Sequence, residues 1–145
     1  MNYKVGDLVE VERLKTKDIS SYKDFIKDVF GYDTSRKNIM KAMKKSIILV
    51  LRLDNKVISS ITLDEEVDYV KDKRYYYASY FGVLTDYRRM GFATKIFEYV
   101  EELIKTNNID YIELTSGNQR KEAHNFYSRH NFRVKDTTVF IKFYK

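Results

Sequence analysis

An almost unbroken apolar run extends from Ser46 to Leu53, and it restricts the architecture more than any other segment of the chain. A run of this length is typical of a strand that is buried on both faces, which requires covering elements on both sides of a sheet. Asp54-Asn55 is a turn signal, and a second apolar stretch follows from Val57 to Leu63. These segments predict a β-hairpin at the centre of a mixed α/β fold.

Periodic segments on both sides of this hairpin predict the remaining elements. Before it, Leu8 to Leu14 alternates as a strand, and two helices follow. The first covers residues 19–30, with Asp18 or Thr16 as its N-cap and Gly31 as its end. The second has Thr34 or Ser35 as its N-cap. After it we expect a polar loop (64–74), a strand (75–84), a helix (92–106), a strand (110–115), a helix (120–130) and two strands (132–135 and 138–143). The order β-α-α-β-β-β-α-β-α-β-β predicts one α/β (α+β) domain over residues 1–145, with about seven strands and about four helices.

Composition excludes several classes of protein. The chain has no cysteine, so disulfides, thiol nucleophiles and cysteine-ligated metals are impossible. No apolar run approaches the roughly 20 residues that span a bilayer, and residues 1–7 lack the apolar stretch of a signal peptide. We therefore expect a cytoplasmic protein without a membrane partner. His124 and His130 lie six residues apart on a helix without an evident third ligand, so no metal is expected.

A net charge of +6 favours anionic partners, which include nucleotides, phosphorylated cofactors and nucleic acid. The segment from Val83 to Ala93 places small residues where a strand ends and a helix begins. The first amides of a helix have no internal partner and carry the positive end of the macrodipole, so such a junction can surround a pyrophosphate. Arg88 and Arg89 add charge, and Gly91 and Ala93 allow close approach. By itself the pattern Arg-x-x-Gly-x-Ala also fits an ordinary basic helix start, and it is neither a P-loop nor a Rossmann fingerprint.

A second segment, one strand and one helix further along, narrows the interpretation. Ala123-His124-Asn125-Phe126-Tyr127 is followed by Asn131-Phe132, and Asn131 is placed to take a left-handed helix stop. In this order the two segments resemble the Gcn5-related N-acetyltransferase (GNAT) superfamily. Arg88 to Ala93 resembles its Gln/Arg-x-x-Gly-x-Gly/Ala acetyl-CoA loop, and Ala123 to Phe132 resembles its Ala-x-x-Phe-Tyr…Gly-Phe signature. Three residues depart from the family pattern. Thr85 stands where many relatives have proline, and Asn131 stands where they usually have glycine. Arg120 stands where many have an asparagine that would contact the pantetheine arm.

The resemblance implies transfer of an acetyl group from acetyl-CoA to a primary amine by direct attack. It assigns Tyr127 as the general acid that protonates the departing thiolate, and a backbone N–H near Phe81 to Val83 as the donor to the developing oxyanion. A tyrosine at this helix position can also be only a core aromatic. The residues expected to bind acetyl-CoA are Phe81, Gly82, Val83, Arg88, Arg89, Met90, Gly91, Phe92, Ala93, Thr94, Asn118, Arg120, Ala123 and Phe126.

The sequence defines the residues that bind the acceptor amine less well than those that bind acetyl-CoA. Phe30, Tyr32 and Asp33 fall where the family's acceptor loop lies, and Tyr80 is on the neighbouring strand; an ordinary helix stop accounts for the first three equally well. Glu113 is the base candidate in the site, with Glu65, Glu66, Asp68 or water as alternatives, since exposed carboxylates are usually plain surface. The acceptor itself is unidentified: a small amine, a peptide, or a protein lysine or N-terminus.

Two other functions stay open at this stage. One is a non-catalytic acyl-CoA-binding regulator, against which the presence of Tyr127 argues. The other is a basic protein directed to nucleic acid or tRNA, which only the net charge supports, so nucleic acid is the less favoured partner. The exposed final strands would offer an edge for a homodimer.

Overall fold

The computed structural model describes residues 9–145, which divide into two compact units after Leu114. The first unit holds the sheet and three helices, and the second holds one helix and the C-terminal segment. The predicted strand from Leu8 to Leu14 begins outside the described residues. That the whole chain acts as one domain stays a prediction.

The first unit is built on a five-stranded mixed sheet in the order β1-β2-β3-β4-β5. Strands β1 to β4 pair antiparallel, and β5 pairs parallel with β4, which confirms the predicted mixed sheet. The strands are β1 (Val9–Arg13), β2 (Ile47–Leu53), β3 (Lys56–Asp68), β4 (Lys73–Val83) and β5 (Tyr111–Leu114).

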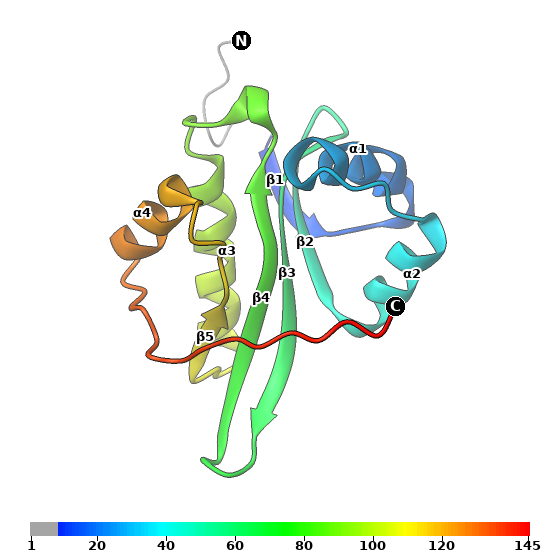
Figure 1. Ribbon diagram of the computed structural model, residues 1–145. Helices are drawn as coiled ribbons and strands as arrows, with labels where there is room; N and C mark the ends of the chain where they lie inside the picture. Colours follow the sequence, from blue (N-terminus) through cyan, green and yellow to red (C-terminus); the bar gives the residue numbers. More distant parts are fainter. Residues whose placement is uncertain (1–8) are drawn as a thin grey trace. The chain divides into compact units, whose positions relative to one another are not determined.

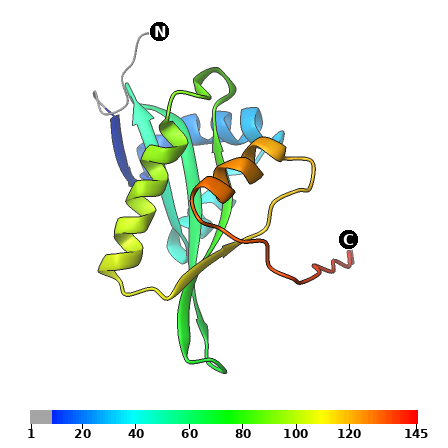
Figure 2. The same cartoon turned by 90° about the vertical axis from the view of Figure 1, so that its left-hand side faces the viewer.

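Helices cover both faces of this sheet, as the buried central run requires. Figures 1 and 2 show α1 (Ile19–Phe30) and α2 (Arg36–Lys45) on one face and α3 (Phe92–Thr106) on the other. Short 3₁₀ turns, η1 (Thr16–Asp18) and η2 (Thr85–Tyr87), lead into α1 and out of β4. Gly31 ends α1 at φ 80°, and the Ser35 hydroxyl caps α2 by accepting from the Asn38 N–H at 3.1 Å, as predicted.

The central hairpin forms as the sequence predicts. Asp54 and Asn55 both adopt positive φ, 51° and 64°, which is the conformation of the tight turn that joins twisted antiparallel strands. Residues 48–53 of β2 are all buried, and so are residues 57–63 of β3. The core of this unit therefore lies around β2 and β3.

The segment from Asp64 to Arg74 differs from its prediction as a loop. Its first half extends β3 to Asp68, its last two residues begin β4, and only the turn at residues 69–72 lies outside the strands. Cross-strand pairing explains the difference: Glu65 forms an ion pair with Arg74 at 3.3 Å, and the Tyr75 ring stacks on Tyr111 at 4.7 Å. A strand exposed to solvent can be polar, so its composition resembles that of a loop.

The second unit contains α4 (Lys121–Arg129), which matches the predicted helix to within a residue at each end. Asn131 has φ 67°, and the Phe132 N–H donates to the Tyr127 carbonyl at 3.0 Å, so the predicted left-handed stop is confirmed. The two final strands, 132–135 and 138–143, are not formed: the described residues after α4 hold no strand. Strand propensity alone is not sufficient, because a strand also has to pair, and among the described residues these two segments pair neither with each other nor with another strand.

Two further results concern residues 9–145 only. No helix there is long and apolar enough to cross a membrane. No group of three or more His, Asp or Glu side chains there is arranged to hold a metal ion.

Candidate functional site

The last part of β4 carries a β-bulge. Ser60 lies opposite Gly82 and Thr62 opposite Ser79, so Tyr80 and Phe81 together face the single residue Ile61. Tyr80 takes the left-handed conformation at φ 51°, which is uncommon for a bulky residue. An extra residue on one strand bends it and increases its twist. The bulge therefore alters the course of β4 just before the strand ends.

Beyond this bulge, one edge of β4 is open. Strand β5 pairs with β4 only as far as the register Ala78–Leu114, so among residues 9–145 no strand pairs with that side of β4 from Ser79 to Val83. The Leu84 N–H donates to the Ile58 carbonyl of β3 at 2.8 Å. Because successive backbone N–H groups in a strand point to alternate edges, that of Val83 points to the open edge.

The chain then turns into α3 through a junction rich in hydrogen-bond donors. Arg88 Nε donates to the Val83 carbonyl at 3.1 Å, which fixes the turn against the end of β4. Arg89 and Gly91 have φ 63° and 86°, and Gly91 is the N-cap of α3 without a side-chain cap. The first amides of this 15-residue helix are thus free of a capping side chain, and Ala93 adds little bulk beside them. The arrangement suits a phosphate or pyrophosphate.

A contact that the sequence did not reveal holds this junction to α1. Asp28 Oδ2 accepts from the Thr85 N–H at 2.9 Å and from the Thr85 hydroxyl at 3.0 Å. Thr85 stands where relatives often have proline, which has no N–H to donate. Asp28 looks like any exposed helix carboxylate in the sequence, and no local pattern could identify its role.

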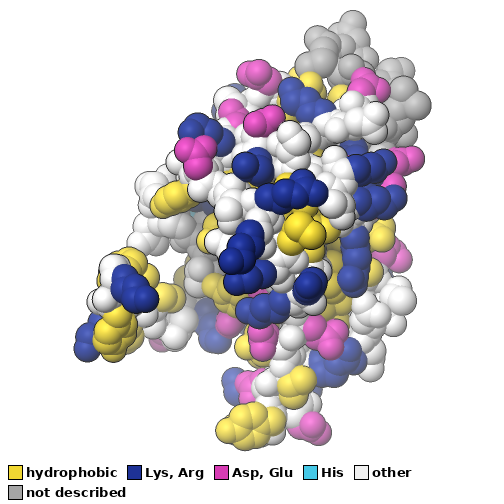
Figure 3. Space-filling model, turned by 90° about the vertical axis from the view of Figure 1, so that its right-hand side faces the viewer, with side chains coloured by type: hydrophobic (Ala, Val, Ile, Leu, Met, Phe, Trp, Pro, Cys, Tyr) yellow, Lys and Arg dark blue, Asp and Glu magenta, His cyan; other side chains and the backbone are white. Residues whose placement is uncertain are grey.

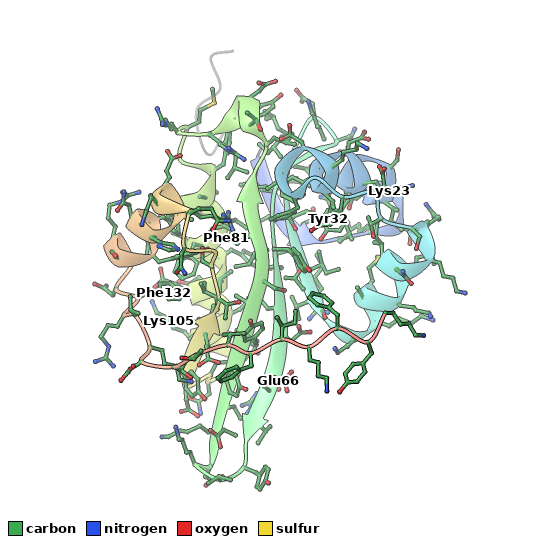
Figure 4. All side chains as sticks on the ribbon, in the orientation of Figure 1. Lys23, Tyr32, Glu66, Phe81, Lys105 and Phe132 are labelled. Atoms are coloured by element: carbon green, nitrogen blue, oxygen red, sulfur yellow. The ribbon has the colours of Figure 1, made fainter. Side chains whose placement is uncertain are left out.

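The expected acceptor residues cluster only in part. The rings of Phe30 and Tyr80 meet edge to face at 5.3 Å, so the end of α1 and the bulge of β4 are in contact. Asp33 instead forms an ion pair with Lys27 at 3.0 Å. Tyr32 is 71% exposed in the loop between α1 and α2. Figure 4 shows Tyr32 on the α1–α2 side of the sheet and Phe81 directed to the α3 side, where Phe81 stacks on Phe97.

The candidate carboxylates lie further back along the sheet. Glu113 on β5 is half-buried and lies opposite Tyr77, four residues or about 13 Å before Phe81. Glu65 is paired with Arg74, and the Asp68 carboxylate accepts from the Lys71 N–H at the hairpin tip. Glu113 is therefore closest to the bulge among these candidates.

Within the second unit, Tyr127 is a buried residue on α4. Its ring packs against Phe126 at 6.0 Å and Phe132 at 5.4 Å. Burial raises the pKa of the Tyr127 hydroxyl, and the charge of Arg120 only partly offsets this. Tyr127 therefore stays protonated throughout the neutral range, as a proton donor must.

The other expected residues of this unit lie at the start of α4. Arg120 is the N-cap, and its N–H donates to the Gly117 carbonyl at 3.0 Å, which closes a turn that includes Asn118. Ala123 and Phe126 follow on the helix and are half-buried. Asn118 and Arg120 are exposed.

Comparisons with known proteins agree with this arrangement. The model of the acetyltransferase (GNAT) family matches residues 15–132, which is most of the chain. No curated protein matches. Because the family model spans strands β2 to β5, the glycine-led junction and α4, the chain belongs to the GNAT acetyltransferase family.

Solved structures share the fold at low sequence identity. An integron cassette protein from the mobile metagenome of V. cholerae superimposes with TM-score 0.78 at 15% identity, covering 97% of this chain and 94% of that one. A ribosomal-protein-alanine N-acetyltransferase from Brucella melitensis gives 0.79 at 12%, covering 93% and 99%. An aminoglycoside 6'-N-acetyltransferase from Acinetobacter baumannii gives 0.76 at 15%, covering 92% and 97%.

Proposed function

We propose that this protein is an acetyl-CoA-dependent N-acetyltransferase that moves the acetyl group to a primary amine by direct attack. The observation that carries the proposal is the continuity of the bulged, open edge of β4 with the uncapped, glycine-led start of α3. This strand edge can pair with an extended arm that contains amide groups. The edge leads directly into the junction, where the pyrophosphate attached to such an arm can bind.

In this proposal the junction binds the diphosphate and the strand edge binds the pantetheine arm. The amides from Gly91 to Thr94 donate to phosphate oxygens, with Arg89 and Met90 lining the approach. Arg88 acts chiefly by fixing the turn, since its Nε already donates to the Val83 carbonyl. The arm pairs along Phe81, Gly82 and Val83 as an added strand. Phe92 is buried and supports the helix start, and Asn118, Arg120, Ala123 and Phe126 complete the binding residues by family resemblance.

At the thioester, a backbone N–H in the segment Phe81 to Val83 donates to the carbonyl oxygen as negative charge develops. The amine nitrogen forms a bond to the acetyl carbon while the carbon–sulfur bond breaks. The sulfur leaves as a thiolate, and Tyr127 gives it a proton from its hydroxyl. The raised pKa of Tyr127 keeps that proton available at neutral pH.

The acceptor amine has to lose a proton before it attacks. An amine with a pKa near that of lysine, about 10.4, is almost wholly protonated at pH 7. We assign Glu113 as the candidate base, acting through water because of its distance from the bulge along the sheet. Phe30 and Tyr80 form one wall of the acceptor side, and Tyr32 and Asp33 lie in the adjoining loop.

The relatives act on different amines, so the fold does not specify the acceptor. Structures of the same fold are named for aminoglycosides and for a ribosomal-protein alanine. For this chain we propose a primary amine without narrowing it further. A cytoplasmic location and a homodimer stay predictions.

The test is release of CoA from acetyl-CoA in the presence of a panel of amines that includes an aminoglycoside, a polyamine, a lysine peptide and an alanine N-terminal peptide. The wild-type chain is expected to release CoA with at least one of them. Tyr127→Phe should slow turnover about 100-fold or more while leaving acetyl-CoA affinity unchanged. The matched control is Tyr144→Phe, which removes the hydroxyl of an 83% exposed tyrosine.

Two results would contradict parts of this proposal. Full turnover by Tyr127→Phe would show that Tyr127 is not the general acid. Tight acetyl-CoA binding without acetyl transfer to any member of a broad amine panel would favour the acyl-CoA-binding regulator.

A further inference from the structure

One helix of this protein carries a dense cluster of positive charge. Helix α2 has the sequence RKNIMKAMKK, with five cations and no acidic residue. A similar excess lies in residues 115–145, which hold seven Lys and Arg against two acidic residues, so the residues outside these two segments are net acidic. All five side chains are exposed, and none forms an ion pair with a residue that the structure describes. They are Arg36, Lys37, Lys41, Lys44 and Lys45.

The cations form a continuous face. At the helical repeat, the four lysines fall within about 100° of arc, on the side opposite Ile39. Ile39 is buried and α2 packs on β2 and α1, so the lysine side is the solvent side of the helix. Lys37, Lys41 and Lys45 recur every fourth residue, which places neighbouring Cβ atoms about 6 Å apart. Figure 3 shows Lys and Arg side chains gathered on this side of the molecule, over α1 and α2.

The stability of the helix does not explain this pattern. Lys44 and Lys45 at the C-terminal end are favourable to the macrodipole, but Arg36 and Lys37 occupy the first turn, where cations are unfavourable. The lysine series at i, i+4 spacing adds repulsion between like charges. A helix selected for stability alone would carry acidic residues in its first turn. The arrangement therefore indicates an anionic partner outside the chain.

An exposed aromatic side chain lies in the loop that precedes this helix. Tyr32 is 71% exposed in the loop that leads into α2, and the nearby Asp33 is neutralised by Lys27. Single-stranded nucleic acid is bound by cations that follow the phosphates together with exposed rings that stack on unpaired bases, and this helix and the loop before it supply both kinds of group. An anionic membrane fits less well, because the apolar side of α2 already packs on the sheet and cannot insert.

We infer that the α2 lysine face together with Tyr32 is a docking surface for single-stranded nucleic acid. The inference goes beyond acetyl transfer, and its test needs neither acetyl-CoA nor an acceptor. It assigns a role to the five exposed cations of α2.

The test is fluorescence anisotropy of a labelled oligo(U) RNA of about 20 nucleotides against the full chain, over a range of salt concentrations. Each phosphate contact contributes about 0.7 to the slope of log affinity against log salt for single strands. Lys37→Ala/Lys41→Ala/Lys45→Ala should therefore reduce that slope by about 2 and weaken binding at least tenfold at about 0.1 M salt. The matched control, Lys71→Ala/Lys73→Ala/Lys105→Ala, removes the same charge from exposed positions elsewhere and should stay near wild type.

A second pair of variants tests the aromatic contribution. Tyr32→Ala should weaken oligo(U) binding about fivefold or more through loss of stacking, whereas Tyr69→Ala, at an 86% exposed position, should not. Circular dichroism and the melting temperature establish that each variant is folded. If the two triple-lysine variants lose the same amount of oligo(U) affinity, the inference is overturned, because binding would then follow net charge alone. Binding to anionic lipid vesicles but not to oligo(U), or preference for a duplex with no effect of Tyr32→Ala, would overturn it as well.

Discussion

Gly91 shows how one residue can serve both backbone geometry and ligand access. Its φ of 86° is strained for any residue with a Cβ, and it is the N-cap of α3. Glu at this position would place bulk and a negative charge where the diphosphate is expected. We predict that Gly91→Glu weakens acetyl-CoA binding at least about 100-fold in isothermal titration calorimetry while the far-ultraviolet circular dichroism is retained.

Gly91→Ala is the control for that variant, because it introduces the same backbone strain, about 1 kcal/mol, without the charge. It should bind acetyl-CoA within about tenfold of wild type. Normal affinity in Gly91→Glu would contradict the assignment of the junction.

A buried ion pair sets the acid stability of the first unit. Arg52 and Asp18, 5% and 3% exposed, are joined by bonds of 2.7 and 3.0 Å. Burial raises the pKa of Asp18, but the Arg52 guanidinium and the Lys15 N–H outweigh it and lower that pKa below its ordinary value. Lys15 and Arg52 also hold the pKa of Glu12 at about 2.

A carboxylate whose pKa is lower in the folded state than in the unfolded state stabilises the fold at any pH above its unfolded pKa, which is near 4. This contribution is lost as the pH falls through the folded pKa. We therefore predict that the free energy of unfolding is steady from pH 7 to about pH 5 and falls between about pH 4 and pH 2. Arg52→Met should lose about 3–5 kcal/mol at pH 7, because it leaves Asp18 buried without its partner. Urea denaturation at several pH values measures both effects. An Arg52→Met variant with the acid sensitivity of wild type would be inconsistent with this account.

Among single residues, the sequence was informative where a position needs one particular conformation or chemistry. Gly31 and Asn131 were predictable because few residues accept positive φ. Tyr80 was not, because nothing about a tyrosine in a strand signals a bulge, and Asp28 was not, because its partner Thr85 lies 57 positions away.

At the scale of secondary-structure elements, the packing of α1 against β4 sets the approach of the acceptor loop to the bulge. A Cβ on Gly82 would lie 2.6 Å from Cγ1 of Val29, so α1 sits directly on the strand backbone there. Gly82→Ala should cost about 1–3 kcal/mol of stability through overpacking. Val29→Ala in the same chain should recover most of that loss, since it removes the colliding atom.

Chemical denaturation of the two single variants and the double variant forms a cycle that measures this coupling. Gly117→Ala is a suitable comparison, because its new Cβ would meet only the movable end of the Gln119 side chain. Additive effects of Gly82→Ala and Val29→Ala would show that the close approach does not limit this position.

Elements with an apolar period were predicted well, and polar or unpaired elements were not. The central hairpin and α1, α2, α3 and α4 follow from periodicity and capping residues. The extension of β3 and β4 was taken for a loop because it is charged, although strand pairing and the Glu65–Arg74 ion pair hold it. The segment after α4 was predicted as two strands, but its residues do not pair. The local sequence pattern indicates the strand propensity of a segment, whereas strand pairing depends on a partner that can be distant in the sequence.

At the scale of the whole molecule, two distinct features are combined in one small chain. One is the junction of β4 and α3, whose backbone donors the family resemblance assigns to acetyl-CoA. The other is the lysine face of α2, which no family motif indicated and which became visible only when the fold set its lysines opposite a buried face. The first was predictable because its residues are consecutive in the sequence. The cations of the second are also consecutive in the sequence, but the sequence alone does not show which side of the helix packs on the sheet.

The central claim is that this chain binds acetyl-CoA, and thermal unfolding with and without acetyl-CoA tests it most directly. A ligand at about 100 times its dissociation constant adds roughly 2.7 kcal/mol to the stability of the native state. For a chain of this size we predict a rise in melting temperature of several degrees, larger than any rise given by adenosine alone. No rise at about millimolar acetyl-CoA would contradict the claim and leave a GNAT fold without its co-substrate.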